Sequence, residues 1–156
     1  MQAVKKVAMV IVMENDLEAA VEFYKKLGLK LIFHLKERWA EFKVGDLQIG
    51  LCPTSEKIEY NRTGIVFEVA DLAAFYEAQK DGLLFLDKPV EATHGIMVSL
   101  QDPSGNIIDL YQPTPQKVKD LAQKMSDQDS CCNGRADEAT QRESCCKSEG
   151  ANQGCC

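Results

Sequence analysis

Several features that define common protein classes are missing from this sequence. It has no excess of basic residues, because its formal net charge is −6, so neither nucleic acid nor an anionic membrane is an expected partner. Its N-terminal apolar segment spans about ten residues, whereas a membrane-spanning helix needs about 20. No small-residue cleavage site follows that segment. We therefore expect no signal peptide, a cytoplasmic location and reduced cysteines.

Large apolar side chains are absent from the C-terminal end. Residues 126–156 contain no Val, Ile, Leu, Met, Phe, Trp or Tyr, and such a segment cannot bury enough apolar surface to offset the entropy of ordering. We predict a disordered tail over 126–156. A short amphipathic helix over 115–125, with Pro115 at its first position, is expected to precede it.

The predicted tail holds all but one of the seven cysteines. They form the adjacent pairs Cys131–Cys132, Cys145–Cys146 and Cys155–Cys156. Adjacent cysteines do not easily form a disulfide with each other, and the C-x-x-C spacing of folded zinc modules is missing. Flexible thiol pairs favour soft ions, so we expect Zn(II), Cd(II), Cu(I) or As(III) at these six positions. A redox-sensitive or functionally neutral tail is the alternative.

The body, residues 1–114, contains one pattern twice. In each copy an apolar strand is followed by a helix and three further strands, and each helix carries a Phe-Tyr pair. The first module (about 4–53) has predicted strands over 4–13, 30–34, 38–44 and 47–52, with a helix capped by Asn15 and ended by Gly28. The second (about 63–113) has strands over 63–69, 83–91, 95–101 and 107–112, with a helix between Asp71 and Gly82. The repeat predicts an α+β fold in which two tandem βαβββ modules form a cup-shaped sheet.

Three motifs resemble those of the vicinal oxygen chelate superfamily. They are Asp16-Leu-Glu-Ala-Ala-x-x-Phe23-Tyr24-x-x-Leu27-Gly28-Leu29, Phe67-Glu68-Val69-x-Asp71 and Asp102-Pro103-x-Gly105-Asn106-Ile107-Ile108-Asp109-Leu110. That superfamily holds glyoxalases, bleomycin-resistance proteins, fosfomycin-resistance enzymes and extradiol dioxygenases. The resemblance covers roughly residues 4–114 and implies the fold strongly, but it says little about the reaction.

In metal-dependent members of that superfamily, His or Glu side chains from the central strands hold a divalent ion. The resemblance carries the ligand positions onto Met9, Gly64, Asp109 and Gly50 (or Gln48, if the register differs by two). Only Asp109 is acidic, and one carboxylate does not hold a catalytic metal. We therefore expect no divalent metal of the family's kind in the cup.

Strand alternation predicts the side chains that line the cup. From the first module they are Met9, Ile11, Met13, Gln48, Gly50 and Cys52, and from the second Gly64, Val66, Glu68, Ile107, Asp109 and Tyr111. Trp39 is either a stacking wall of the cup or a core residue. Such a lining suits a small organic ligand with an amine or hydroxyl. Glu68 and Asp109 are candidate acid/base residues if they lie close together; plain core with a wet rim is the alternative.

These observations lead to three functional hypotheses. The first is a small-molecule-binding protein with a soft-metal or metalloid-binding tail, for which a homodimer is plausible. The second is a metal-dependent lyase, isomerase or dioxygenase of the same superfamily, and the third is a metal-buffering stress protein with the body as scaffold. The tail is similar to those of cadmium-inducible proteins and organoarsenical lyases. Residues 91–95, however, lack the cysteines of the organoarsenical lyases, so the activity of those lyases is not carried over to this chain.

Overall fold

A computed structural model of the protein describes residues 3–132. The first compact unit ends at Asp120 and a second begins at Leu121. The elements are β1 (Met9–Glu14), α1 (Leu17–Lys26), β2 (Lys30–Leu35), β3 (Trp39–Val44), β4 (Leu47–Pro53), β5 (Asn61–Glu68), α2 (Leu72–Gln79), β6 (Leu84–Phe85), β7 (Val90–Glu91), β8 (Gly95–Gln101), β9 (Asn106–Pro113) and α3 (Pro115–Cys132). Within the described range, no helix combines the length and apolar character needed to cross a membrane.

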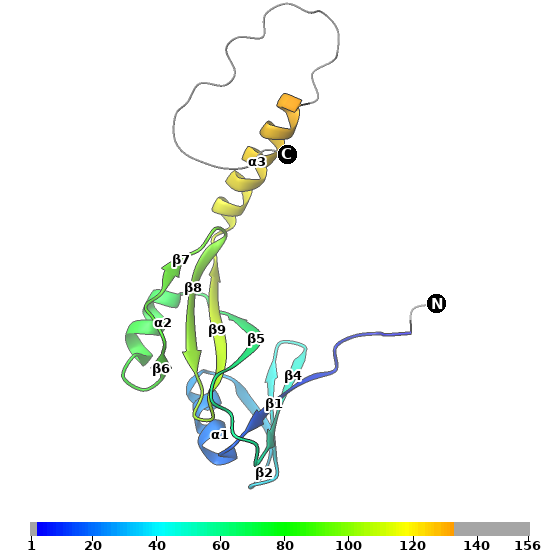
Figure 1. Ribbon diagram of the computed structural model, residues 1–156, viewed down its shortest axis with the longest axis vertical. Helices are drawn as coiled ribbons and strands as arrows, with labels where there is room; N and C mark the ends of the chain where they lie inside the picture. The colour runs from blue at the N-terminus through cyan, green and yellow to red at the C-terminus, as the bar shows by residue number, and fades with distance from the viewer. Residues whose placement is uncertain (1–2, 133–156) are drawn as a thin grey trace, which may run out of the picture. The chain divides into compact units, whose positions relative to one another are not determined.

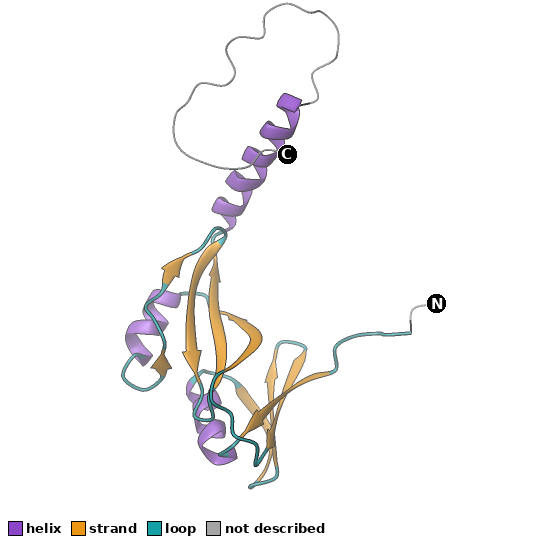
Figure 2. Ribbon diagram, viewed as in Figure 1, coloured by secondary structure: helices purple, strands orange, loops and turns teal. Residues whose placement is uncertain are grey.

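The strands lie in two sheets, one for each module (Figures 1 and 2). The first has the order β1-β4-β3-β2, with β1 parallel to β4. The second has the order β5-β9-β8-β6, with β5 parallel to β9 and β7 also paired to β8. In both modules the first strand therefore pairs with the last, which confirms the predicted α+β fold of two βαβββ modules.

Each sheet buries one face and leaves the other open. On β1, Val12 and Glu14 are buried while Ile11 and Met13 are exposed, as strand alternation requires. The buried faces, together with apolar residues of α1 and α2, form one hydrophobic cluster that includes Tyr24, Phe42 and Leu110. The open faces are the surfaces on which a ligand can bind.

The turn between β8 and β9 connects the two modules. The carboxylate of Asp102 accepts hydrogen bonds at 2.9 Å from the backbone N–H groups of Ser104, Gly105 and Asn106. Its other oxygen accepts from the Asn106 side chain at 2.9 Å and from the hydroxyl of Tyr24, on α1, at 3.3 Å. The same Asn106 amide donates to the Met13 carbonyl in β1 at 2.9 Å. The turn of the second module is thus bound to the helix and first strand of the first.

A second carboxyl group is buried beside this turn. Glu14 has no exposed surface, and no hydrogen bond of normal geometry from the described residues reaches either of its carboxyl oxygens. Burial in an apolar environment, reinforced by the negative charge of Asp102, raises the pKa of Glu14 to about 9. Glu14 is therefore protonated at neutral pH in the folded protein.

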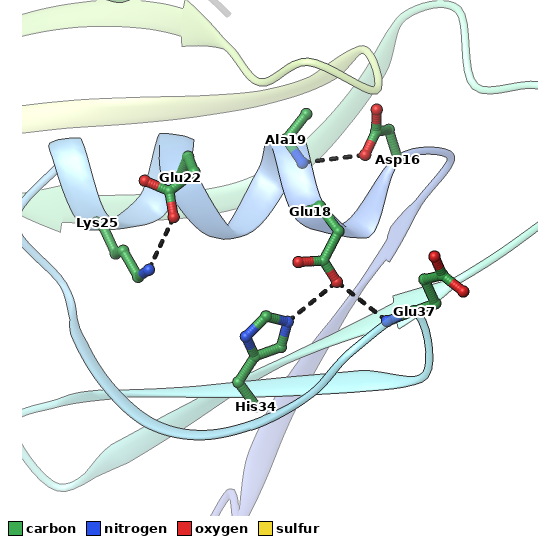
Figure 3. Close-up of polar contacts among 7 residues, drawn as sticks. All are labelled: Asp16, Glu18, Ala19, Glu22, Lys25, His34 and Glu37. Carbon is green, nitrogen blue, oxygen red and sulfur yellow. Dashed lines mark hydrogen bonds and ion pairs between the residues drawn. The ribbon is translucent and has the colours of Figure 1, made fainter.

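The cap of the first helix differs from the prediction. Asp16, and not Asn15, is the N-cap, because its side chain accepts a hydrogen bond from the Ala19 N–H at 3.0 Å (Figure 3). The Asn15 side chain instead holds the chain after β4, since it donates to the carbonyls of Thr54 and Glu56 and accepts from the Ile58 N–H. These tertiary partners are not visible in a local capping pattern.

Glu18 does not close the predicted capping box. Its carboxylate accepts from the Glu37 N–H at 3.0 Å and contacts the His34 ring at 3.1 Å (Figure 3). The hydrogen bond from Glu37, followed by the His34 contacts, lowers the pKa of Glu18. Glu18 therefore holds the turn between β2 and β3 against the helix.

Two further boundaries differ from the prediction. The strand expected over 83–91 is divided into β6 and β7, because Pro89 has no N–H to donate to a strand ladder. Helix α3 continues to Cys132, so residues 126–132 are helical where a disordered tail was expected. Backbone hydrogen bonds within a helix need no apolar side chains, and neither Gly nor Pro occurs between Met125 and Cys132.

Replacing Glu14 by Gln is expected to stabilise the protein at neutral pH. Between the ordinary pKa of 4.5 and the folded value of about 9, unfolding releases the Glu14 proton, so the free energy of unfolding falls as pH rises through this range. Gln does not ionise, and the variant should gain about 2–3 kcal/mol at pH 7. Urea unfolding at several pH values measures the difference.

The matched control is Glu22→Gln, because Glu22 lies on the exposed side of α1. The free energy of unfolding should depend less steeply on pH between pH 5 and pH 9 in Glu14→Gln than in the wild type. Glu22→Gln should keep the slope of the wild type. Equal slopes in wild type and both variants would contradict the buried, protonated state of Glu14.

Candidate functional site

A hollow of about 590 Å³ lies on the second sheet. This volume is within the range of small-molecule sites, about 300–1,000 Å³. The floor comes from Met97, Val98 and Ser99 of β8 and from Asp109 of β9, while Arg62 of β5 and the residues Asp87, Lys88 and Val90 form the two sides. Strand order explains this arrangement, since β9 and β8 lie between β5 on one side and β6 and β7 on the other (Figure 1).

The β8–β9 hairpin positions the polar floor. Its register pairs Ser99 with Asp109 and Met97 with Tyr111, so these side chains emerge on one face. The Ser99 hydroxyl donates to Oδ1 of Asp109 at 2.5 Å. The hydrogen bond orients Asp109 in the floor.

An irregularity in β5 positions the cationic side. The β5–β9 register shifts between Arg62 and Val66, where Gly64 has a φ of 72°. Arg62 pairs with Ile107, and Val66 pairs with Asp109. Two extra residues on β5 thus separate these pairs, and bulges of this kind redirect side chains near binding sites. Thr63 anchors the bulge by donating to the Ile107 carbonyl at 2.8 Å.

Of the residues predicted to line the cup, only Asp109 lines this hollow. Val66 and Glu68 are exposed on β5, and Glu68 pairs in register with Tyr111 and not with Asp109. Within the described residues no hydrogen bond joins Glu68 to Asp109; the partner of Asp109 is Ser99. The proton-sharing pair of Glu68 and Asp109 stays a prediction.

Gly64, Ile107 and Tyr111 also lie on β5 and β9 of the second sheet but do not line the hollow, and Ile107 is buried. The residues predicted from the first module gather on the open face of the first sheet. Register pairs Met9 with Gln48, Ile11 with Gly50 and Met13 with Cys52. Ile11 and Met13 of this face are exposed by 55% and 42%. Glu41 and Lys43, which pair with Gly50 and Gln48, add charged side chains to the same face. The structure thus brings this group together, on a sheet separate from the hollow.

Trp39 belongs to the same open face. A Cβ on Gly50 would lie 2.5 Å from Cη2 of the Trp39 indole, so the ring lies directly over that glycine. The indole N–H donates to Glu41 at 2.8 Å, which holds the ring against the sheet. Trp39 is therefore a positioned aromatic surface, as in the stacking-wall alternative.

The chain does not supply a donor set for the family's divalent ion. Among Met9, Gly50, Gly64 and Asp109, only Asp109 offers an oxygen ligand, and replacing Gly50 by Gln48 adds only an amide. No group of three or more His, Cys, Asp or Glu side chains that could hold a metal ion occurs in residues 3–132. Asp109 is already bound by Ser99. The residues at these positions do not fit a divalent cation.

Most lining residues of the hollow were missed by sequence reasoning. Met97 and Ser99 could have been found by counting back across the Asp102–Asn106 turn, which pairs them with residues of β9. Arg62 depends on the β5 bulge, for which Gly64 is only a weak signal. Asp87 and Lys88 line the hollow because Pro89 interrupts the predicted strand. Among the predicted metal-binding cysteines, Cys131 and Cys132 end α3, while Cys145, Cys146, Cys155 and Cys156 lie outside the described residues.

Comparisons with known proteins were made on the sequence and on the structure. The model of the Glyoxalase/Bleomycin resistance protein/Dioxygenase superfamily matches residues 6–110. No curated protein gives a significant match. The chain is similar to TnmS3, an antibiotic binding protein from Streptomyces sp. CB03234, with 26% identity, 73% of this chain and 100% of that chain covered, and a TM-score of 0.60.

Two further solved structures share the fold. One is the bleomycin-binding protein from bleomycin-producing Streptomyces verticillus, solved with copper(II)-bleomycin, with 21% identity, coverage of 71% of this chain and 99% of that chain, and a TM-score of 0.56. The other is the fosfomycin resistance protein FosX from Listeria monocytogenes, with 16% identity, coverage of 73% and 98%, and a TM-score of 0.61.

Replacing Gly50 by Ala is expected to displace the Trp39 ring. The added Cβ would also lie 2.9 Å from the Met9 sulfur, so the ring must move, at a stability loss of about 1–3 kcal/mol. Trp39 is the single tryptophan of the chain, and its fluorescence emission should shift to longer wavelength. Gly82→Ala is the control, because its nearest atoms would lie at 3.8 Å. Unchanged emission in both variants would contradict this packing.

Proposed function

The chain belongs to the Glyoxalase/Bleomycin resistance protein/Dioxygenase superfamily, and from this premise we propose that it binds a small organic ligand in the hollow on its second sheet. The observation that carries the proposal is the lining of that hollow, in which an oriented carboxylate, a hydroxyl and two cations surround apolar side chains. Apolar lining with a few directed polar groups is the usual composition of a small-molecule site. The likeness to an antibiotic binding protein supports binding without turnover.

The donor set supports binding over metal-dependent catalysis. A Lewis-acid or dioxygenase mechanism needs several converging ligands and an open position, and the family ligand positions of this chain offer Asp109 alone as an acid. We propose that the hollow works without a divalent ion. The superfamily lyase, isomerase or dioxygenase remains the competing function.

A panel of antibiotics that includes bleomycin and fosfomycin tests ligand binding. At least one compound should bind the full-length protein with 1:1 stoichiometry in calorimetry and perturb the NMR signals of Met97, Ser99 and Asp109. If the compound carries an amine, Asp109→Asn should lower the affinity for it by about tenfold or more, because a hydrogen bond to a charged group is lost. Asp46→Asn, in the β3–β4 turn, is the control.

Two results would count against this function. Absence of binding across the panel, or binding that leaves the NMR signals of the hollow unchanged, would contradict it. Consumption of a bound compound after addition of a divalent ion would favour the enzyme. Products are followed by mass spectrometry in the same samples.

We also propose a homodimer that covers the open face of the first sheet. This face exposes Phe33 and Leu35 of β2 by 51% and 48%, and Ile11 and Met13 of β1, at the opposite edge of the sheet, by 55% and 42%. Exposed apolar side chains of this kind mark interaction sites. A second copy suits this face, because a twofold pair buries the same patch on each chain.

The tail adds a separate proposal. We propose that Cys131, Cys132, Cys145, Cys146, Cys155 and Cys156 bind a soft ion, Zn(II), Cd(II), Cu(I) or As(III), in a reducing cytoplasm. The proposal rests on the cysteine pairs in the sequence, since soft thiolate ligands select these ions. A body that serves only as scaffold for a metal-buffering tail is the alternative.

Native mass spectrometry of anaerobically purified protein tests the tail. The full-length protein should retain soft ions in proportion to its cysteine pairs, and a chain ending at Met125 should retain none, because the thiolates have been removed. The chain ending at Met125 should still have the mass of a dimer. A divalent ion kept by the shortened chain would contradict the metal-free hollow, and a monomer mass would contradict the dimer.

A further inference from the structure

The hollow carries equal numbers of positive and negative side chains that are not paired with each other. Arg62 and Lys88 supply the cations, and Asp87 and Asp109 the carboxylates. No ion pair joins any of these four groups in the part of the chain that the structure describes. Because these four groups do not neutralise one another in ion pairs, their charges are available to a ligand.

Asp109 keeps one oxygen available. Ser99 donates to Oδ1 at 2.5 Å, and no hydrogen bond from residues 3–132 reaches Oδ2. The side chain is only partly buried. An oriented carboxylate with a free oxygen, in the floor of a hollow, is suited to accept hydrogen bonds from a ligand ammonium group.

Arg62 provides the complementary group on the neighbouring strand. Its guanidinium lies 5.8 Å from the centre of the Tyr60 ring and donates to the Tyr60 hydroxyl at 3.4 Å. These contacts orient the guanidinium and leave most of its N–H donors free. A planar guanidinium binds carboxylates and phosphates through two parallel hydrogen bonds.

The register places the backbones of the two residues close together. Arg62 pairs with Ile107 on β9, and Asp109 is the next residue on the same face of that strand. Two residues of a strand span about 6.6 Å. A molecule whose ammonium and anionic groups are a few bonds apart can contact both side chains at once.

We propose that the hollow binds a small zwitterion, with its ammonium group on Asp109, its anionic group on Arg62 and its apolar part against Val90 and Met97. This inference rests on the proposed function, because it specifies the ligand class of the same site. A ligand with one charge would contact one of the two groups and would face repulsion or an unpaired charge at the other. The opposite charges of the site therefore select for opposite charges in the ligand.

Three probes that share one scaffold test this inference on the full chain. L-phenylalanine carries both charges, L-phenylalaninamide only the ammonium group, and N-acetyl-L-phenylalanine only the carboxylate. In NMR titrations at millimolar concentrations, phenylalanine should bind about tenfold more tightly than either analogue, because each charged contact contributes about that factor. The perturbed signals should include Ser99 and Asp109.

Two variants assign the charges. Arg62→Gln should weaken the binding of phenylalanine about tenfold and leave the affinity for the amide unchanged. Asp109→Asn should weaken the binding of phenylalanine about tenfold and leave the affinity for the acetylated analogue unchanged. The matched controls are Arg38→Gln and Asp46→Asn, in the two turns that flank β3. The controls should bind all three probes as the wild type does.

The inference is overturned if the three probes bind equally, if none of them perturbs the hollow, or if neither variant changes the affinity for phenylalanine. This failure is separable from failure of the proposed function. An antibiotic that perturbs Met97, Ser99 and Asp109 while the zwitterion does not would keep the small-molecule site and reject only its selectivity.

Discussion

One buried carboxylate holds the two halves of this protein together. Asp102 accepts five hydrogen bonds, from the backbone of its own turn, from Asn106 and from Tyr24 of the first module. The turn thereby docks against α1 and β1. Gly105 allows the segment before β5 to pass close to the turn, because its φ is 107° and a Cβ would lie 3.0 Å from the carbonyls of Ile58 and Glu59.

The position of the candidate site depends on this turn. The turn sets the β8–β9 register, the register places Ser99 opposite Asp109, and their hydrogen bond orients the floor of the hollow. The same junction also buries Glu14, and this second carboxyl group beside Asp102 has to keep its proton at neutral pH. The junction that defines the site is thus also the place where the fold holds a group in its unfavourable protonation state.

The two sheets use the same device on their open faces. Trp39 lies over Gly50 in the first sheet, and Tyr111 lies over Gly95 in the second, where a Cβ would be 2.3 Å from the Tyr111 ring. The Tyr111 hydroxyl also donates to the His94 carbonyl at 3.0 Å. Each face therefore carries a fixed aromatic ring, and on the second sheet the charged hollow lies beside it. Ligand chemistry depends on the sides of that hollow, which the shared fold does not specify.

Local patterns in the sequence predicted the repeated βαβββ order, the alternation along β1 and β4 and the Asp71 cap. These follow from local periodicity and residue chemistry, which act over a few neighbouring residues. The tertiary structure decided that the Asn15 side chain binds the segment after β4, which leaves the cap of α1 to Asp16, and that the β5 bulge redirects Arg62. Pro89 is a local signal for the interrupted strand, but the position of Asp87 and Lys88 at the hollow depends on β8 and β9. These outcomes depend on partners far away in the chain, which a local pattern does not contain.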